Sequence, residues 1–106
     1  MSTSLTVLSS RHLERAGYTV ERVEHYNWYT KRRVDLLGVG DLLALNGKEL
    51  LMVQVTSRSN LSHRQRKAEK SDKLKLWISA GGKLVFHGWD KPKFRWRLKE
   101  IQYEQK

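Results

Sequence analysis

Two apolar runs joined by Asn46-Gly47 constrain the fold of this chain more than any other feature. The runs lie within residues 33–57, and Asn-Gly between apolar segments is the strongest short-range signal for a hairpin with a two-residue type I′ turn. Such a turn predicts that Leu45 pairs with Lys48. The sequence therefore predicts an antiparallel pair of strands at the centre of the fold.

The hairpin register predicts which side chains share a face, because successive residues of a strand point to opposite sides. In this register Asp41 pairs with Met52. One face is expected to be polar at its far end, where it carries Asp41, Gln54 and Thr56. The same face is expected to pack under a helix near the turn, through Leu43, Leu50 and Met52. The opposite face is apolar and carries Leu42, Ala44, Leu51, Val53 and Val55.

The segments before the hairpin predict a helix and a strand. Residues 3–16 have leucines near one face and are followed by Gly17, which favours a helix that ends there. Residues 18–24 are rich in β-branched side chains and predict a strand. Residues 25–33 are polar and aromatic and are interpreted as a loop or an extension of that strand.

The segments after the hairpin predict a helix and two further strands. Residues 58–70 are expected to be a loop leading into a helix that runs to about residue 80, and residues 83–89 a strand. Residues 94–99 alternate, which predicts that Phe94, Trp96 and Leu98 point inward and that Arg95, Arg97 and Lys99 point outward. The predicted order is α-β-β-β-α-β-β, an α/β (α+β) fold with a mixed sheet.

The charge favours a polyanionic partner. The net charge is +10, and residues 57–106 alone carry +9, from 14 Lys and Arg against 5 Asp and Glu. A cationic field of this density favours nucleic acid, because neutralised phosphates release counterions. A solubilising surface or a ribosome-type basic protein is the alternative, and an anionic membrane is a weaker one.

Several classes of protein are excluded by composition. The chain has no cysteine, which excludes disulfides, thiolate zinc sites and cysteine nucleophiles. It has no apolar stretch of the about 18 residues that span a bilayer, and its N-terminus does not resemble a secretory signal. We therefore expect a cytoplasmic protein with no membrane association.

The hairpin resembles the core of the PD-(D/E)xK nuclease superfamily. The segment 40–44, Gly-Asp-Leu-Leu-Ala, resembles the "PD" element, and the segment 53–56, Val-Gln-Val-Thr, stands where "(D/E)xK" is expected. Gly38-Val39-Gly40 is similar to the archaeal Holliday-junction-resolvase branch, and the pattern also resembles small uncharacterised phage and bacterial proteins. The resemblance implies a restriction endonuclease-like α-β-β-β-α-β core within one nuclease domain over residues 1–106.

The resemblance also implies a site for Mg²⁺ or Mn²⁺ held by oxygen ligands. Asp41 is the expected ligand, with the Gln54 amide oxygen and the Val55 carbonyl completing the shell. Thr56 stands where the family has a lysine, so Lys67 or Lys70 would have to supply the catalytic cation. Further carboxylates are expected from Glu24 and Asp35, and less strongly from Glu14.

Each of these residues also has a structural interpretation. Asp35 could form only a surface ion pair with the cations of residues 31–33, and Glu24 could be a solvated strand residue. Gln54 could be a core amide bonded to the backbone. Asp41 is harder to explain this way, because a carboxylate between apolar runs destabilises a fold unless it is paired or coordinated.

The leading hypothesis is a Mg²⁺-dependent DNA nuclease acting on branched or recombination intermediates. The alternative is a catalytically impaired nuclease-fold module that binds nucleic acid, and a third reading is an adaptor that docks on an acidic protein. Candidate partners are branched, duplex or single-stranded DNA, and a homodimer follows by analogy with resolvases. Trp28 and Tyr29 are candidates for base stacking. The cations expected to bind nucleic acid are Arg32, Arg33, Arg58, Arg64, Arg66, Lys67 and Lys70.

Overall fold

The computed structural model describes residues 4–104, with the exception of the side chain of Arg33. Residue 3, at the start of the predicted first helix, lies outside these residues. The elements follow one another in the order α1 (Leu5–Arg15), β1 (Thr19–Arg22), β2 (His25–Asn27), β3 (Arg32–Val34), β4 (Leu42–Leu45), β5 (Leu50–Ser57), η1 (Arg58–Asn60), α2 (Leu61–Glu69), α3 (Asp72–Ser79), β6 (Lys83–Asp90), η2 (Pro92–Phe94) and β7 (Arg97–Gln102).

Five strands form one mixed sheet in the order β1-β4-β5-β6-β7. Strands β5 and β6 are parallel and are connected through α2 and α3, whereas the other neighbours are antiparallel. This arrangement confirms the predicted mixed α/β fold class. The predicted helix toward residue 80 is interrupted, because the Ser71 hydroxyl accepts a hydrogen bond from Leu74 N (3.2 Å) and so caps a new helix, α3.

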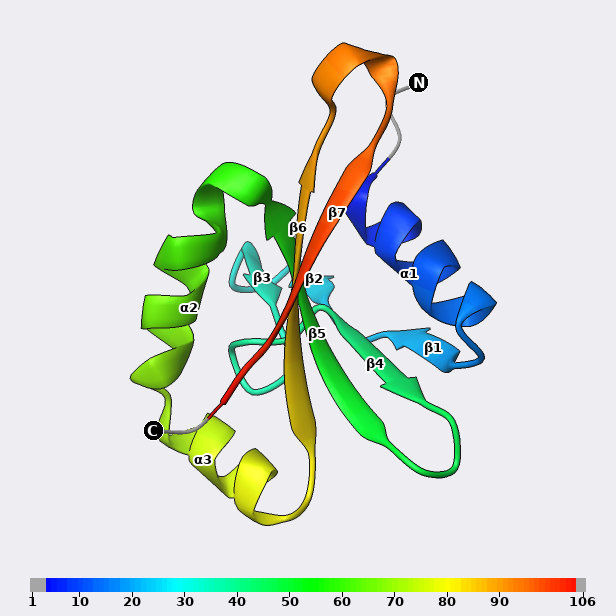
Figure 1. Ribbon diagram of the computed structural model, residues 1–106. Coiled ribbons are helices and arrows are strands. Elements are labelled where there is room, and N and C mark those ends of the chain that lie inside the picture. Colours follow the sequence, from blue (N-terminus) through cyan, green and yellow to red (C-terminus); the bar gives the residue numbers. More distant parts are fainter. Residues whose placement is uncertain (1–3, 105–106) are drawn as a thin grey trace.

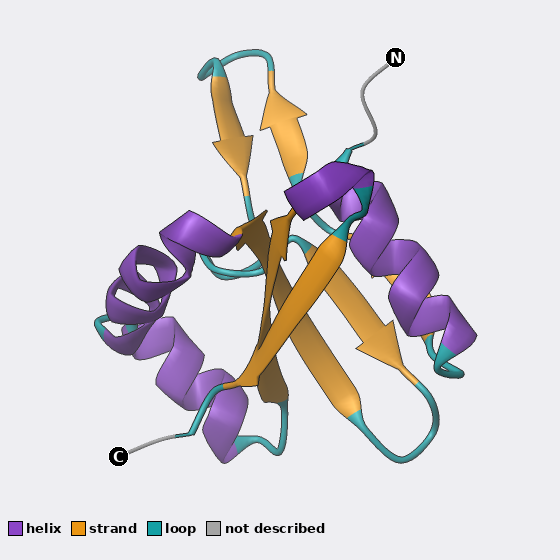
Figure 2. Ribbon diagram, turned by 45° about the horizontal axis from the view of Figure 1, so that its top comes forward, coloured by secondary structure: helices purple, strands orange, loops and turns teal. Residues whose placement is uncertain are grey.

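Helices cover both faces of the sheet (Figures 1 and 2). On one face, α2 and α3 contribute buried Leu61, Ala68 and Leu74 to a core with Met52 and Phe86. On the other face, Leu13 of α1 packs on a second core, whose sheet residues are Leu42, Ala44, Leu51, Val53 and Val85. The prediction that both faces of the hairpin are covered is therefore confirmed, with the apolar set 42, 44, 51 and 53 facing α1.

The predicted hairpin register is wrong by two residues. Leu45 pairs with Leu50 rather than with Lys48, so four residues form the loop. The cause is the Asn46 side chain, whose Oδ1 accepts hydrogen bonds from Lys48 N (3.0 Å) and Glu49 N (2.8 Å), with Gly47 at a φ of +86°. Leu50 consequently lies at the exposed end of β5 and does not pack under a helix.

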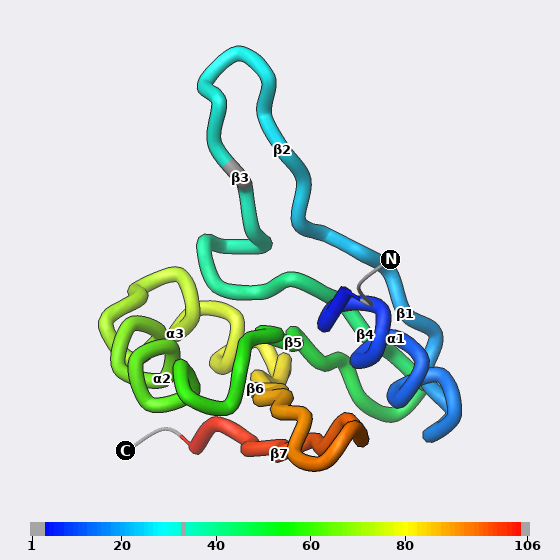
Figure 3. The backbone as a smooth tube through the Cα atoms, turned by 90° about the horizontal axis from the view of Figure 1, so that it is seen from above, coloured from blue at the N-terminus to red at the C-terminus, as the bar shows by residue number. Residues whose placement is uncertain are grey.

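Residues 25–34 form a second, two-stranded sheet instead of the predicted loop or strand extension. In it His25 pairs with Val34 and Asn27 with Arg32. Figure 3 shows this β2–β3 hairpin standing out from the rest of the chain. The five-stranded sheet begins again only at β4, so the hairpin is an insertion between two neighbouring strands.

The predicted strand 94–99 is displaced toward the C-terminus. Strand β7 begins at Arg97, and Phe94 lies in the preceding turn with a φ of +72° and is 94% exposed. Trp96 is also exposed, beneath the Lys91 ammonium, which lies 5.2 Å from the ring centre. The expected inward row of Phe94 and Trp96 is therefore wrong.

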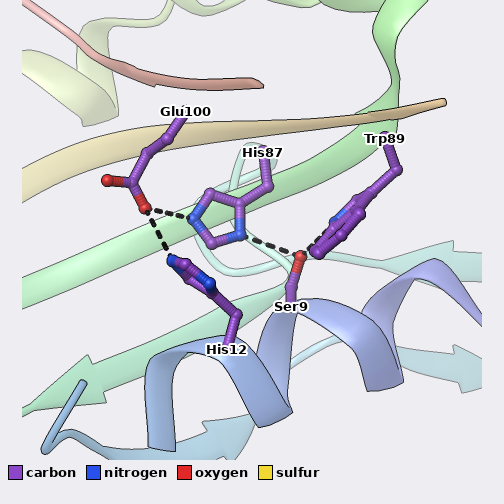
Figure 4. A network of polar contacts seen from close by, with 5 residues as sticks. All are labelled: Ser9, His12, His87, Trp89 and Glu100. Atoms are coloured by element: carbon purple, nitrogen blue, oxygen red, sulfur yellow. Dashed lines mark hydrogen bonds and ion pairs between the residues drawn. The ribbon is translucent and has the colours of Figure 1, made fainter. Parts of the chain in front are cut away.

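A buried polar network attaches α1 to β6 and β7 (Figure 4). The Ser9 hydroxyl accepts a hydrogen bond from Trp89 Nε1 (2.7 Å) and lies 2.9 Å from His87 Nδ1. His87 Nε2 lies 2.7 Å from Glu100 Oε2, and His12 approaches the same oxygen at 3.8 Å. The pKa of His87 is lowered, chiefly because the ring is buried, and the hydrogen bond to Glu100 partly opposes this shift.

Candidate metal and nucleic-acid site

Three carboxylates meet at one edge of the sheet. Glu24, Asp35 and Asp41 each place an oxygen so that all three oxygens lie within 4.8 Å of one another. Glu24 follows β1, Asp35 follows β3 and Asp41 precedes β4. Glu24 and Asp41 are buried and Asp35 is half-buried. The alternative in which Glu24 is a solvated strand residue is therefore wrong.

The backbone around Asp41 brings the three acids together. Leu36 and Gly40 exchange two hydrogen bonds, Leu36 N to Gly40 O (2.8 Å) and Gly40 N to Leu36 O (2.9 Å). Their outer neighbours, Asp35 and Asp41, consequently lie side by side. The Asp41 carbonyl accepts from Glu24 N (3.3 Å), which holds the third acid next to it.

The glycine before Asp41 is required by packing against β5. A Cβ at Gly40 would overlap the side chain of Met52, which belongs to the core beneath α2 and α3. Asp41 N also donates to Val53 O (2.8 Å). The position of Asp41 is therefore determined by the same hairpin that builds the core.

Strand β5 supplies two donors to the Asp41 carboxylate. Oδ2 accepts a hydrogen bond from Val55 N (2.7 Å) and one from Gln54 Nε2 (3.3 Å). Gln54 thus bonds a carboxylate rather than the backbone, contrary to the structural interpretation of this amide. Burial raises the pKa of Asp41 to about 7. The hydrogen bond from Val55 N opposes this rise, whereas a hydrogen bond with Glu24 and the negative charges of Glu24 and Asp35 add to it.

A cavity of about 120 Å³ lies over these groups and is lined by Thr6, Glu24, Asp35, Asp41, Gln54, Val55 and Arg64. Asp35 Oδ1 is buried and has no hydrogen-bond partner among the described residues. Three carboxylates of which one keeps an unpaired buried oxygen are a donor set that suits a hard divalent cation. The residues present therefore fit a metal of the Mg²⁺ type.

Arg64 lines this cavity and Arg22 forms an ion pair with Glu24 (2.9 Å), whereas the two predicted lysines lie elsewhere. Lys67 is exposed on α2 and lines a neighbouring groove, and Lys70 is exposed at the end of that helix. Thr56 is buried on the same face of β5 but does not line the cavity. Glu14 lies outside the cluster, on the exposed side of α1, where it accepts a hydrogen bond from Ser10.

A groove of about 790 Å³ adjoins the acidic cavity. It runs between the β2–β3 hairpin and the helices α2 and α3, and Asp35 lines both spaces. Three cations from separate elements line it: Arg32, Lys67 and Lys73. A polyanion bound in this groove would therefore lie beside the three carboxylates.

The other predicted nucleic-acid-binding residues are distributed over the surface. Arg58 lies 3.6 Å from Asp90, which Arg97 also contacts at 2.9 Å. Arg66 is exposed on α2. The backbone of Arg33 belongs to β3, but its side chain lies outside the described part of the chain.

Sequence analysis missed Thr6 and the role of Arg64 in the cavity. Arg64 lies three residues after Leu61 and four before Ala68, both buried on the inner face of α2. This helical spacing was the available signal, because it places Arg64 on the same face. Thr6 precedes buried Ser9 and Leu13 by three and seven residues in α1, which is the same pattern.

The fold is similar to that of Hjc, a Holliday junction resolvase from the archaeon Archaeoglobus fulgidus, with a TM-score of 0.53. The match covers 89% of this chain and 67% of the resolvase chain, at 17% sequence identity. No protein-family model and no curated protein matches the chain. At this identity the likeness concerns the fold, and it confirms the predicted restriction endonuclease-like architecture. Within residues 4–104, no helix is long and apolar enough to cross a membrane.

Proposed function

We propose that residues 1–106 form a single metal-dependent DNA nuclease domain that hydrolyses phosphodiester bonds. The observation that carries this proposal is the cluster of Glu24, Asp35 and Asp41 within 4.8 Å, at the end of a cationic groove in a restriction endonuclease-like fold. Its resolvase neighbour favours branched DNA as the substrate. A homodimer and a cytoplasmic location stay predictions.

The three carboxylates would hold Mg²⁺ or Mn²⁺, with Gln54 and the Val55 carbonyl as further candidate ligands. A bound divalent cation supplies a Lewis acid for the phosphate and lowers the pKa of a water molecule. Asp41 must lose its proton to act as a ligand, so its raised pKa makes metal binding stronger as the pH rises. The Gln54 amide and the Val55 N–H orient this carboxylate.

Arg64 would take the part that the absent motif lysine plays in the family. It lines the cavity from α2, and a guanidinium can bind two phosphate oxygens at once. Lys67 and Arg32, in the adjoining groove, would hold the backbone on either side. In this chain the cation would come from the helix after β5 instead of from the strand.

The test is cleavage of four-way junctions, duplexes and single strands by the purified protein in Mg²⁺ and in Mn²⁺. We expect metal-dependent cleavage that Asp41→Asn and Glu24→Gln each reduce at least about a hundredfold, since each removes a charged ligand. Glu14→Gln is the matched control, because Glu14 is exposed outside the cluster. No cleavage of any DNA form in either metal, or undiminished cleavage by Asp41→Asn, would contradict the proposal.

A second candidate is a nuclease-fold module that binds DNA without cutting it. It is favoured by one observation, the presence of Thr56 where the family has its lysine. It predicts binding that depends on salt but not on Mg²⁺ or on Asp41. Affinity measured with and without Mg²⁺ for the wild type and for Asp41→Asn separates the two candidates.

A further inference from the structure

The tip of the β2–β3 hairpin exposes aromatic side chains to solvent. Trp28 is 80% exposed and Tyr29 is 99% exposed, and the preceding Tyr26 is also exposed. The hairpin projects away from the rest of the chain (Figure 3), and none of these rings belongs to either core. Such a group of exposed rings is characteristic of a binding surface.

The tip has a defined conformation. Asn27 Oδ1 accepts hydrogen bonds from Tyr29 N (2.9 Å) and Thr30 N (3.2 Å), which closes the turn. The rings of Tyr26 and Trp28 pack edge to face, with their centres 4.8 Å apart. The rings are therefore presented on an ordered turn, which reduces the entropy lost when a ligand stacks on them.

The aromatic tip is continuous with the cationic groove. Asn27 and Thr30, which form the turn, also line the groove together with Arg32, Lys67 and Lys73. The groove ends at Asp35, one of the three carboxylates. Because Tyr26 pairs with Arg33, its ring and the Trp28 ring packed on it lie on the hairpin face away from Asn27 and Arg32. The rings and the groove therefore meet at the tip, through the turn that carries both.

We propose that an unpaired strand of DNA follows a path over the tip of the hairpin and into the groove, with bases stacked on Trp28 and Tyr29 and phosphates along Arg32, Lys67 and Lys73. Flat ring faces of unpaired bases are accessible to aromatic side chains, whereas those of a duplex are stacked inside it. The order of features leads the strand toward the acidic cavity. This inference rests on the proposed nuclease function, which the acidic cavity would carry out, and it names an unpaired strand as the form of substrate that reaches the cavity.

Binding measured without metal tests this proposal separately from cleavage. Fluorescence anisotropy of labelled single-stranded DNA and of blunt duplex, in EDTA and over a range of salt, compares the wild type with Trp28→Ala and Tyr29→Ala. We expect each substitution to weaken single-strand binding by on the order of tenfold, because stacking contributes about 1–3 kcal/mol per base. The slope of log K against log salt should not change, since no cation is removed.

Phe94→Ala is the matched control, because Phe94 is an equally exposed ring on a different turn. It should leave both affinities unchanged. Arg32→Ala should lower the salt slope by about 0.7 for the single strand. Unchanged single-strand binding by Trp28→Ala, or equal losses for single strand and duplex, would overturn the proposal.

Two other occupants are tested in the same series. If Trp28→Ala abolishes self-association in sedimentation, or binding to vesicles containing phosphatidylserine, while DNA binding is retained, the proposal is wrong. If single-strand binding depends on Trp28 but no DNA is cleaved in metal, the strand path is supported and the nuclease function fails. If cleavage occurs but binding is indifferent to Trp28, the reverse holds.

Discussion

Replacement of Asp41 by Asn should stabilise the metal-free protein while it removes the proposed nuclease activity. The pKa of Asp41 rises from 3.8 to about 7 in the fold, chiefly through burial. A carboxyl with a raised pKa favours folding below its unfolded pKa, and this benefit is lost as the pH rises through 7. At about 1.36 kcal/mol per pKa unit, the ionised carboxylate therefore lowers the free energy of unfolding of the metal-free protein by about 4 kcal/mol at pH 8.

We expect Asp41→Asn to recover about half of this, about 2 kcal/mol at pH 8. The amide oxygen still accepts from Val55 N, but the bond is weaker without the negative charge, and water in the cavity screens the original repulsion. For a chain of this size the melting temperature should rise by about 10 °C. At pH 5 the gain should fall below about 1 kcal/mol, because the folded wild type already carries the proton.

Urea denaturation followed by tryptophan fluorescence measures both values. Glu21→Gln is the matched control, since Glu21 is exposed on β1, and its effect should stay within about 0.5 kcal/mol at both pH values. Mg²⁺ should stabilise the wild type by about 1.4 kcal/mol at ten times its Kd and should stabilise Asp41→Asn less. If Asp41→Asn is not more stable than the wild type at pH 8, or is more stable by the same amount at pH 5, then burial and repulsion do not raise the pKa of Asp41 as inferred.

Two further predictions concern His87 and the nucleic-acid surface. Because burial lowers the pKa of His87, the wild type should lose stability relative to His87→Gln as the pH falls below 6.5, by up to about 1.4 kcal/mol per pH unit. Urea denaturation at several pH values measures this, and a stability difference that does not change with pH would contradict it. For DNA binding we compare two triple alanine variants, one on α2 and one near β7. We expect the α2 variant to flatten the slope of log K against log salt more, by about 0.9 per lost duplex phosphate contact. A larger effect of the other variant would show that DNA binds near β7 and not on α2. The sets are Arg64, Arg66 and Lys67 against Arg95, Arg97 and Lys99.

The sequence predicted the faces of the central hairpin correctly despite the wrong register. Since the error is two residues and side chains alternate with a period of two, every residue stayed on its predicted face. The error changed only which residues are opposite each other. The observed register brings Asp41 next to the end of β5, where Asp41 N donates to Val53 O and the Gln54 amide donates directly to the Asp41 carboxylate.

The features that the sequence did not predict have both local and long-range causes. The loop length was set by the Asn46 side chain, which competes with the expected tight turn for the backbone N–H groups. The attachment of Ser9 to His87 joins residues 78 positions apart, so no local pattern indicates it. Glu24 and Asp35 were identified as candidates, but the approach of Asp35 to Asp41 required the paired hydrogen bonds of Leu36 and Gly40, and that of Glu24 the bond from its N–H to the Asp41 carbonyl.

The sheet topology has a consequence for the order of folding. Asp41 and Gln54 belong to the antiparallel β4–β5 hairpin, whose short loop makes closure inexpensive in entropy; they are only 13 residues apart. Strand β6 pairs only after the α2–α3 crossover has closed, and the contacts of Ser9 with β6 span 78 and 80 residues. The carboxylates can therefore gather before the C-terminal half docks, and their mutual repulsion increases when docking buries Glu24 and Asp41.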